Sequence, residues 1–166
     1  MAIRRILKKG DTALYKPCKP VTKFDWRLHA LLGDLQDTMY EADGVGLAAS
    51  QVGILRRVAV VDCGDGLIEL VNPEIVSREG EYGDMEGCLS FPGESGYVVR
   101  SERVTVKAQD RDGAWWEYEG EGLLARALQH ELDHLDGKVY VDLISEPPAE
   151  FLRELERREQ EADEEA

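Results

Sequence analysis

The sequence predicts an α+β domain in which antiparallel β-sheets pack around a central helix, with one helix toward each end of the chain. Three observations predict this fold class. Apolar residues recur every three or four positions over residues 25–42 and 122–136, as they do in amphipathic helices. Short apolar or alternating runs joined by Gly-containing turns lie between these helices, which is typical of antiparallel hairpins. A chain of 166 residues has the size of one domain, so we expect a single domain over residues 1–166.

Residues 25–118 hold the first helix and all of the predicted strands. The helix is expected over residues 25–42, where the Asp25 carboxylate can cap its N-terminus. Two hairpins follow, and their strands are expected at residues 57–63 with 67–72 and at residues 104–108 with 115–118. A long connection without a predicted element separates the two hairpins.

The second half holds the central helix and a charged C-terminal helix. The central helix is expected over residues 122–136, because Gly137 stands where a glycine ends many helices. A last helix follows the Pro147–Pro148 pair, and we expect its acidic tail to fray from about residue 160.

The charge and the cysteine content exclude several classes of protein. The chain has 20 Lys and Arg against 34 Asp and Glu, a net charge of −14, which repels phosphate backbones over most of the surface. No sequence-specific nucleic-acid partner is therefore expected. No long apolar run predicts a membrane contact. Three cysteines without a CxxC pair do not suggest a disulfide framework, so we expect a reducing compartment, the cytoplasm.

The HELDH motif, residues 130–134, is the strongest chemical signal. A spacing of four places His130 and His134 on one face of a helix, where both can bind a metal ion, and Glu131 can reach a water on that ion. A catalytic metal site needs a third protein ligand and an open position. Cys88 in the bent loop MEGCLSFPG is the better candidate for that ligand.

Two other hypotheses remain open at this point. A zinc endopeptidase would take Glu154 of the last helix as its third ligand, since Tyr140 stands where the pattern HExxHxxGxxH has its last histidine. A structural zinc module would close all four metal positions with protein ligands, and the sequence shows no fourth ligand.

Three motifs in this order and at these separations resemble the signatures of the peptide deformylases: GVGLAASQ, EGCLS and QHELDHLDG. The resemblance covers most of residues 1–150. It implies an enzyme that removes the formyl group from N-formylmethionine at the N-terminus of new polypeptides and releases formate. It also implies one divalent metal ion per chain, Fe(II) in the native enzyme, with Zn, Ni or Co as alternatives. The implied partners are N-formylmethionyl peptides and, in a transient contact, the ribosome.

The resemblance assigns roles residue by residue. It implies that three residues hold the metal: Cys88, His130 and His134. It makes Glu131 the catalytic acid and base, and it gives the binding of the formyl oxygen to the Gln51 side chain and the Leu89 backbone N–H.

Three further residues match positions around the reacting groups. Gly46 matches a position whose backbone binds the substrate peptide, and Glu86 and Arg100 match a pair that braces the loop of Cys88. The nine acidic residues from Glu146 onward argue against docking of the last helix on the ribosome.

Overall fold

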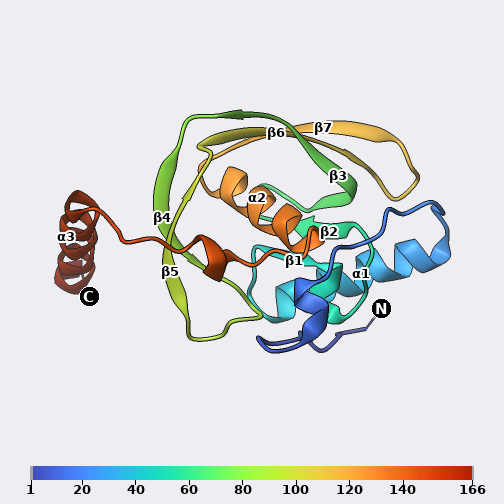
Figure 1. Ribbon diagram of the computed structural model, residues 1–166, viewed down its shortest axis with the longest axis horizontal. Helices are drawn as coiled ribbons and strands as arrows, with labels where there is room; N and C mark the ends of the chain where they lie inside the picture. The colour runs from blue at the N-terminus through green and yellow to red at the C-terminus, as the bar shows by residue number, and fades with distance from the viewer. Residues whose placement is uncertain (1, 166) are drawn as a thin grey trace.

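The structure, a computed structural model, describes residues 2–165 and has the predicted α+β architecture (Figure 1). The helices are α1 (Trp26–Glu41), α2 (Leu123–Leu135) and α3 (Ala149–Glu165). Short 3-10 turns are η1 (Thr12–Tyr15), η2 (Ala49–Val52) and η3 (Tyr140–Leu143). The strands are β1 (Gly46–Ala48), β2 (Val58–Val61), β3 (Ile68–Glu79), β4 (Tyr82–Gly87), β5 (Ser95–Arg100), β6 (Arg103–Gln109) and β7 (Trp115–Glu121).

All paired strands of the two sheets are antiparallel. The larger sheet has the order β1-β2-β3-β6-β7, so that β1 lies at one edge, and the smaller sheet consists of β4 and β5. Both predicted hairpins are present as β2-β3 and β6-β7. The fold class predicted from the sequence is therefore confirmed.

The long connection between the two hairpins contains strands that the sequence pattern did not predict. Strand β3 continues to Glu79, and β4 and β5 pair over six residues, from Tyr82 opposite Arg100 to Gly87 opposite Ser95. Strand β4 reads YGDMEG, which has two glycines and two acids and therefore little strand propensity. Its ladder forms because Gly83 leaves room for the ring of Tyr97, which a Cβ would overlap.

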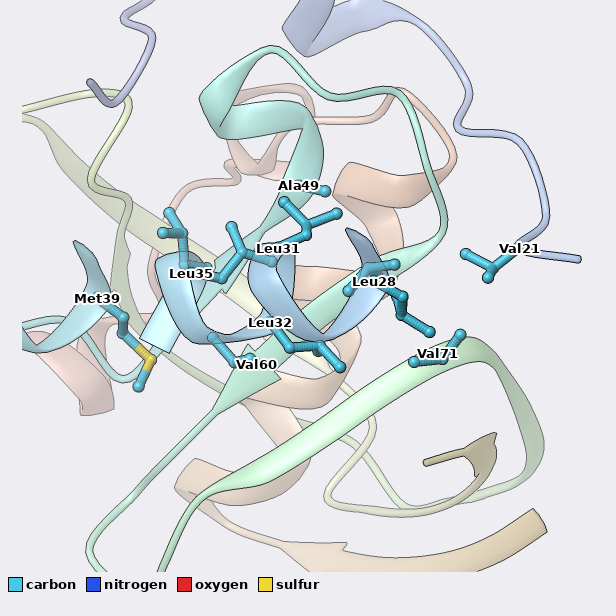
Figure 2. Close-up of a cluster of buried hydrophobic side chains, with 11 residues drawn as sticks. Val21, Leu28, Leu31, Leu32, Leu35, Met39, Ala49, Val60 and Val71 are labelled. Carbon is cyan, nitrogen blue, oxygen red and sulfur yellow. The ribbon is translucent and has the colours of Figure 1, made fainter. Parts of the chain in front are cut away.

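Helix α1 packs on the larger sheet and forms the main hydrophobic core (Figure 2). Asp25 caps it as predicted, since its carboxylate accepts hydrogen bonds from the N–H groups of Arg27 and Leu28 at 3.1 and 3.3 Å. Figure 2 shows the leucines of α1 between β2, β3 and η2, with Met39 at the C-terminal end. The core cluster contains Val21, Leu28, Leu31, Leu32, Leu35, Met39, Leu47, Ala49, Val58, Val60 and Val71.

Helix α2 lies in the middle of the molecule, with β3, β6 and β7 on one side and β1, β2 and α1 on the other (Figure 1). Ten of its thirteen residues are buried. The helix ends at Leu135, and Gly137 follows its C-cap with a φ of +75° that favours glycine. A Cβ at Gly137 would lie 2.8–3.0 Å from the backbone of Tyr15 and Lys16. This contact packs the C-terminal end of α2 against the segment of Tyr15 and Lys16.

Helix α3 stands apart from the rest of the chain (Figure 1). None of its described residues is fully buried, and Phe151 packs against Tyr97 of β5 with ring centroids 4.8 Å apart. The helix continues to Glu165 and so includes the segment where fraying is expected. Among residues 2–165, no helix is long and apolar enough to cross a membrane.

Truncation of the core under α1 tests this packing. Leu32→Ala removes a side chain with no exposed surface, so we expect the free energy of unfolding to fall by about 2–5 kcal/mol. Urea unfolding measures the change. The matched control, Leu152→Ala on α3, truncates a side chain that is 45% exposed and should change it by less than about 0.5 kcal/mol. Equal losses in both variants would contradict the assigned core.

Candidate metal centre

Three side chains from distant parts of the chain converge on one point. His130 and His134 lie one turn apart on α2, and Cys88 lies in the loop that follows β4. Their donor atoms are all within 4.8 Å of one another. The Nε2 atoms of the two imidazoles are 3.1 Å apart, and the Sγ of Cys88 is 3.3 Å from the Nε2 of His134. The structure thus brings together the three residues that the sequence singles out as metal ligands.

These donors fit a divalent transition metal ion. Tetrahedral bonds of about 2.1 Å to nitrogen and 2.3 Å to sulfur place donor atoms about 3.4–3.6 Å apart, close to the separations found here. One thiolate with two imidazoles is a donor set that suits zinc and also ferrous iron, cobalt or nickel. Within residues 2–165 this is the one group of His, Cys, Asp and Glu side chains that is close enough to hold an ion.

The electrostatics of the cluster favour a positive charge at the same place. Burial opposes protonation of His130, but negative charge on Glu131, Cys88 and Glu86 outweighs it and raises the pKa of His130 to about 10. Burial and the neighbouring His130 hold the pKa of His134 well below its usual value. A proton and a metal ion compete for the same lone pairs, so a site that attracts one also attracts the other.

The carboxylate of Glu86 orients the first imidazole. It accepts a hydrogen bond from the Nδ1 of His130, which leaves Nε2 of that ring free to face Cys88 and His134. Arg100 donates to the same carboxylate through Nε at 2.9 Å. Burial would raise the pKa of Glu86, but Arg100 and His130 hold it well below the usual range. The pairing of Glu86 with Arg100 that the sequence suggested is present.

Arg126 is a member of this cluster that the sequence analysis missed. Its Nη1 lies 2.8 Å from Glu86 and also donates to the carbonyl of Val98, while Nη2 donates to the carbonyl of Tyr82. It therefore ties α2 to both strands of the smaller sheet. The available signal was its position four residues before His130, because a charged residue on a buried helix face needs a partner.

Glu131 is buried and its carboxylate is unpaired on one side. Its Oε1 has no hydrogen-bond partner among the described residues, and its other oxygen lies against Gly46, where a Cβ would overlap it. Burial raises the pKa of Glu131 to about 7, although the charge on His130 opposes the rise. A carboxyl group with a pKa near neutrality can both accept and return a proton.

Gln51 and Leu89 border the same point. The Oε1 of Gln51 accepts the N–H of Ala48 at 3.0 Å, so the amide nitrogen is turned toward Ser90, at 3.1 Å, and the Sγ of Cys88, at 3.5 Å. The backbone N–H of Leu89 makes no hydrogen bond within the described part of the chain. Both groups can donate to an oxygen atom bound beside the cluster.

A cavity of about 270 Å³ opens beside the cluster. Cys88, His130, Glu131 and Gln51 form one wall together with Gly46. Apolar residues line much of the remainder: Val45, Met85, Leu89, Leu123 and Ala127. An apolar space beside polar reacting groups is the usual form of a small-molecule site.

Comparison with known proteins agrees with this geometry. The family profile described as "Polypeptide deformylase" matches residues 3–149. The chain belongs to the polypeptide deformylase family. It is 53% identical to a peptide deformylase of Caldicellulosiruptor bescii over 163 residues, which are 98% of this chain and 97% of that protein.

Solved peptide deformylases share the fold. The crystal structure of the Thermotoga maritima enzyme matches with a TM-score of 0.86 at 46% identity, covering 88% of this chain and all of that one. The Legionella pneumophila structure matches with a TM-score of 0.85 at 49% identity, covering 99% of this chain and 96% of that one. The resemblance found in the three motifs therefore extends over the deformylase fold.

The structure argues against both alternatives to a deformylase site. Glu154 lies on α3, where its carboxylate is 2.6 Å from Arg157, and it is not part of the metal-binding group. A structural zinc site needs four protein ligands, and only three donor residues gather within residues 2–165. A tetrahedral ion held by these three residues would have one position left for water or substrate.

Loss of the thiol tests the ligand set. We expect Cys88→Ala to lower metal affinity by at least about a hundredfold, because one of three protein ligands is lost. Competition with a chromophoric chelator measures the affinity. The control is Cys63→Ala, since Cys63 packs beside another core cluster and should not affect metal binding. Unchanged affinity in Cys88→Ala would remove Cys88 from the site.

Proposed function

We propose that this deformylase family member hydrolyses the formyl amide of N-formylmethionyl peptides and releases formate and a free methionine N-terminus. The observation that carries the proposal is the convergence of Cys88, His130 and His134 beside the buried carboxylate of Glu131. The Oε1 atom of that carboxylate has no hydrogen-bond partner among the described residues. Cys88, His130 and Glu131 line a cavity of about 270 Å³, which is large enough for a side chain.

Cys88, His130 and His134 would hold one divalent ion, for which we propose Fe(II) as the native metal. When bound, the ion lowers the pKa of a coordinated water and polarises the carbonyl of the substrate. The thiolate supports a soft or borderline metal over magnesium or calcium. It also makes the centre sensitive to oxidation, since thiolates react with oxidants.

Glu131 would move the protons. Its carboxylate accepts a proton from the attacking water, whose oxygen forms the new bond to the formyl carbon. The same carboxyl group then gives this proton to the amine nitrogen as the carbon–nitrogen bond breaks, so formic acid and a neutral amine leave. The acid ionises to formate, and its proton passes to solvent or to the released amine. The pKa of about 7 supports both directions of transfer near neutral pH.

Gln51 and Leu89 would bind the formyl oxygen. The side-chain amide of Gln51 is oriented by its bond to Ala48, and the Leu89 N–H is available, so both groups can donate to an oxygen beside the cluster. Donors of this kind stabilise the negative charge that develops on the oxygen, and the loss of one typically costs about 3 kcal/mol of barrier.

Gly46 would bind the backbone of the peptide. It begins β1, which is the edge strand of the larger sheet, and its neighbour Val45 lines the cavity. An extended peptide can add to such an edge through backbone hydrogen bonds. The apolar cavity beside it suits a methionine side chain, which supports formylmethionine as the substrate residue.

We infer that the reaction takes place in the cytoplasm on newly made polypeptides, with a transient contact to the ribosome. Three free cysteines, Cys18, Cys63 and Cys88, support a reducing compartment. The acidic residues of α3 do not favour contact with RNA through that helix.

Formate release from a formyl-Met peptide tests the function. The protein is loaded with Fe(II) without oxygen and compared with Glu131→Gln. We expect the variant to retain its metal and to lose kcat by at least about a hundredfold, because no group replaces the carboxylate as a proton acceptor. A wild-type protein that cleaves internal peptide bonds but releases no formate would overturn the proposal.

The contact between Gly46 and Glu131 gives an independent test. In Gly46→Ala the new methyl group must displace the Glu131 carboxylate, so we expect kcat to fall by about tenfold or more while the metal content stays unchanged. Formate release and metal analysis of the same sample measure the two quantities. Wild-type kcat in this variant would show that the position of Glu131 is not constrained by β1.

A further inference from the structure

The N-terminal segment carries a charge opposite to that of the rest of the protein. Residues 1–27 contain eight Lys and Arg against two Asp, whereas residues 28–166 contain twelve Lys and Arg against 32 Asp and Glu. A small basic region on an otherwise acidic molecule attracts a polyanion to one place and in one orientation.

Part of this charge gathers around a second cavity of about 390 Å³. Its rim has four cationic side chains: Arg4, Lys23, Arg27 and Arg56. The apolar floor is formed by Val21, Leu28, Leu31 and Ile54. We call this cavity with its rim the basic hollow.

Most of the cations of the basic hollow have no acidic partner. Lys23, Arg27 and Arg56 are exposed, and none of them forms a salt bridge within residues 2–165. Arg4 is paired with Asp34 at 2.8 Å. The one acid of the lining, Asp25, already accepts the two N–H groups that it caps in α1. The hollow therefore has an uncompensated positive charge.

An aromatic ring stands beside these cations. Trp26 is 70% exposed, and the guanidinium of Arg27 lies over its ring at 5.3 Å from the centroid. Exposed aromatic rings next to basic side chains are the usual platform for single-stranded nucleic acid, since bases stack on the ring while phosphates contact the cations. A flat lipid surface would not reach the floor of a concave site.

We propose that the basic hollow and Trp26 bind single-stranded segments of RNA without sequence specificity. The choice of RNA rests on the proposed function, because the ribosome, from which newly made polypeptides emerge, is rich in RNA. The hollow and the catalytic cleft share no lining residue and lie at opposite ends of α1, whose sixteen residues span about 24 Å. Bound RNA would therefore leave the cleft open to a peptide.

RNA binding is measured with the metal-loaded protein and a fluorescent single-stranded RNA of about 12 nucleotides, by anisotropy at several salt concentrations. The test variant is K23A/R27A/R56A. We expect its affinity to fall by about tenfold or more, and the slope of log affinity against log salt to decrease by about 2, because three phosphate contacts are lost.

The matched control is R153A/R157A/R158A, which removes the same net charge from exposed positions on α3. We expect this variant to bind RNA within about twofold of the wild type. Equal losses in the two triple variants would overturn the proposal, because net charge and not the hollow would then explain binding.

A second pair of variants tests the stacking contact. Trp26→Ala should lower the affinity for RNA by about fivefold or more and leave the salt slope unchanged, since a stacked base releases no counterion. Trp116→Ala, which truncates a ring that is 55% exposed on β7 and whose Nε1 donates to Asp110 at 2.8 Å, is the control and should have no effect.

Two further measurements separate the outcomes. Formate release should be the same in K23A/R27A/R56A and in the wild type. If the wild type binds RNA but neither protein releases formate, RNA binding by the basic hollow is supported and the proposed function is refuted. Absence of RNA binding by the wild type at about 50 mM salt would overturn the hollow alone. The RNA proposal would also be overturned if Lys23, Arg27 and Arg56 bound the protein to vesicles of phosphatidylglycerol but not to RNA.

Discussion

A single buried carboxylate, that of Glu86, determines the geometry of the metal centre. It lies on β4 and accepts hydrogen bonds from Arg100 of β5 and from Arg126 and His130 of α2. Two guanidinium groups compensate its charge in a place where an unpaired carboxylate would be costly. Because the smaller sheet and the central helix share this carboxylate, the loop of Cys88 is held against the two imidazoles.

The catalytic arrangement depends on close packing as much as on charge. β1 approaches α2 so closely that a Cβ at residue 46 would overlap the carboxylate of Glu131, and this contact constrains the position of the carboxylate. Gly44 similarly receives the side chain of Leu89, where a Cβ would lie 2.7 Å from its Cδ1. The glycines of the segment GVGLAASQ thus allow the edge of the larger sheet, the helix and the Cys88 loop to meet.

The sequence predicted those features that depend on local spacing. The two long buried helices, the Asp25 cap, the Gly137 end point and both hairpins follow from periodicity and turn residues, and the HELDH face follows from a spacing of four. The third ligand does not follow from spacing, because Cys88 approaches α2 only through the tertiary fold, and it was predicted from its bent loop and from the resemblance of the three motifs. Strands β4 and β5 and the role of Arg126 were missed, since they depend on pairing partners remote in sequence.

The central claim is that one thiolate and two imidazoles hold a single ion and leave a position open. X-ray absorption at the metal edge of the zinc-loaded protein tests it most directly. The account predicts one sulfur at about 2.3 Å, two imidazole nitrogens at about 2.0–2.1 Å and one light atom from water. A coordination shell without sulfur, or one closed by a fourth protein ligand, would contradict it.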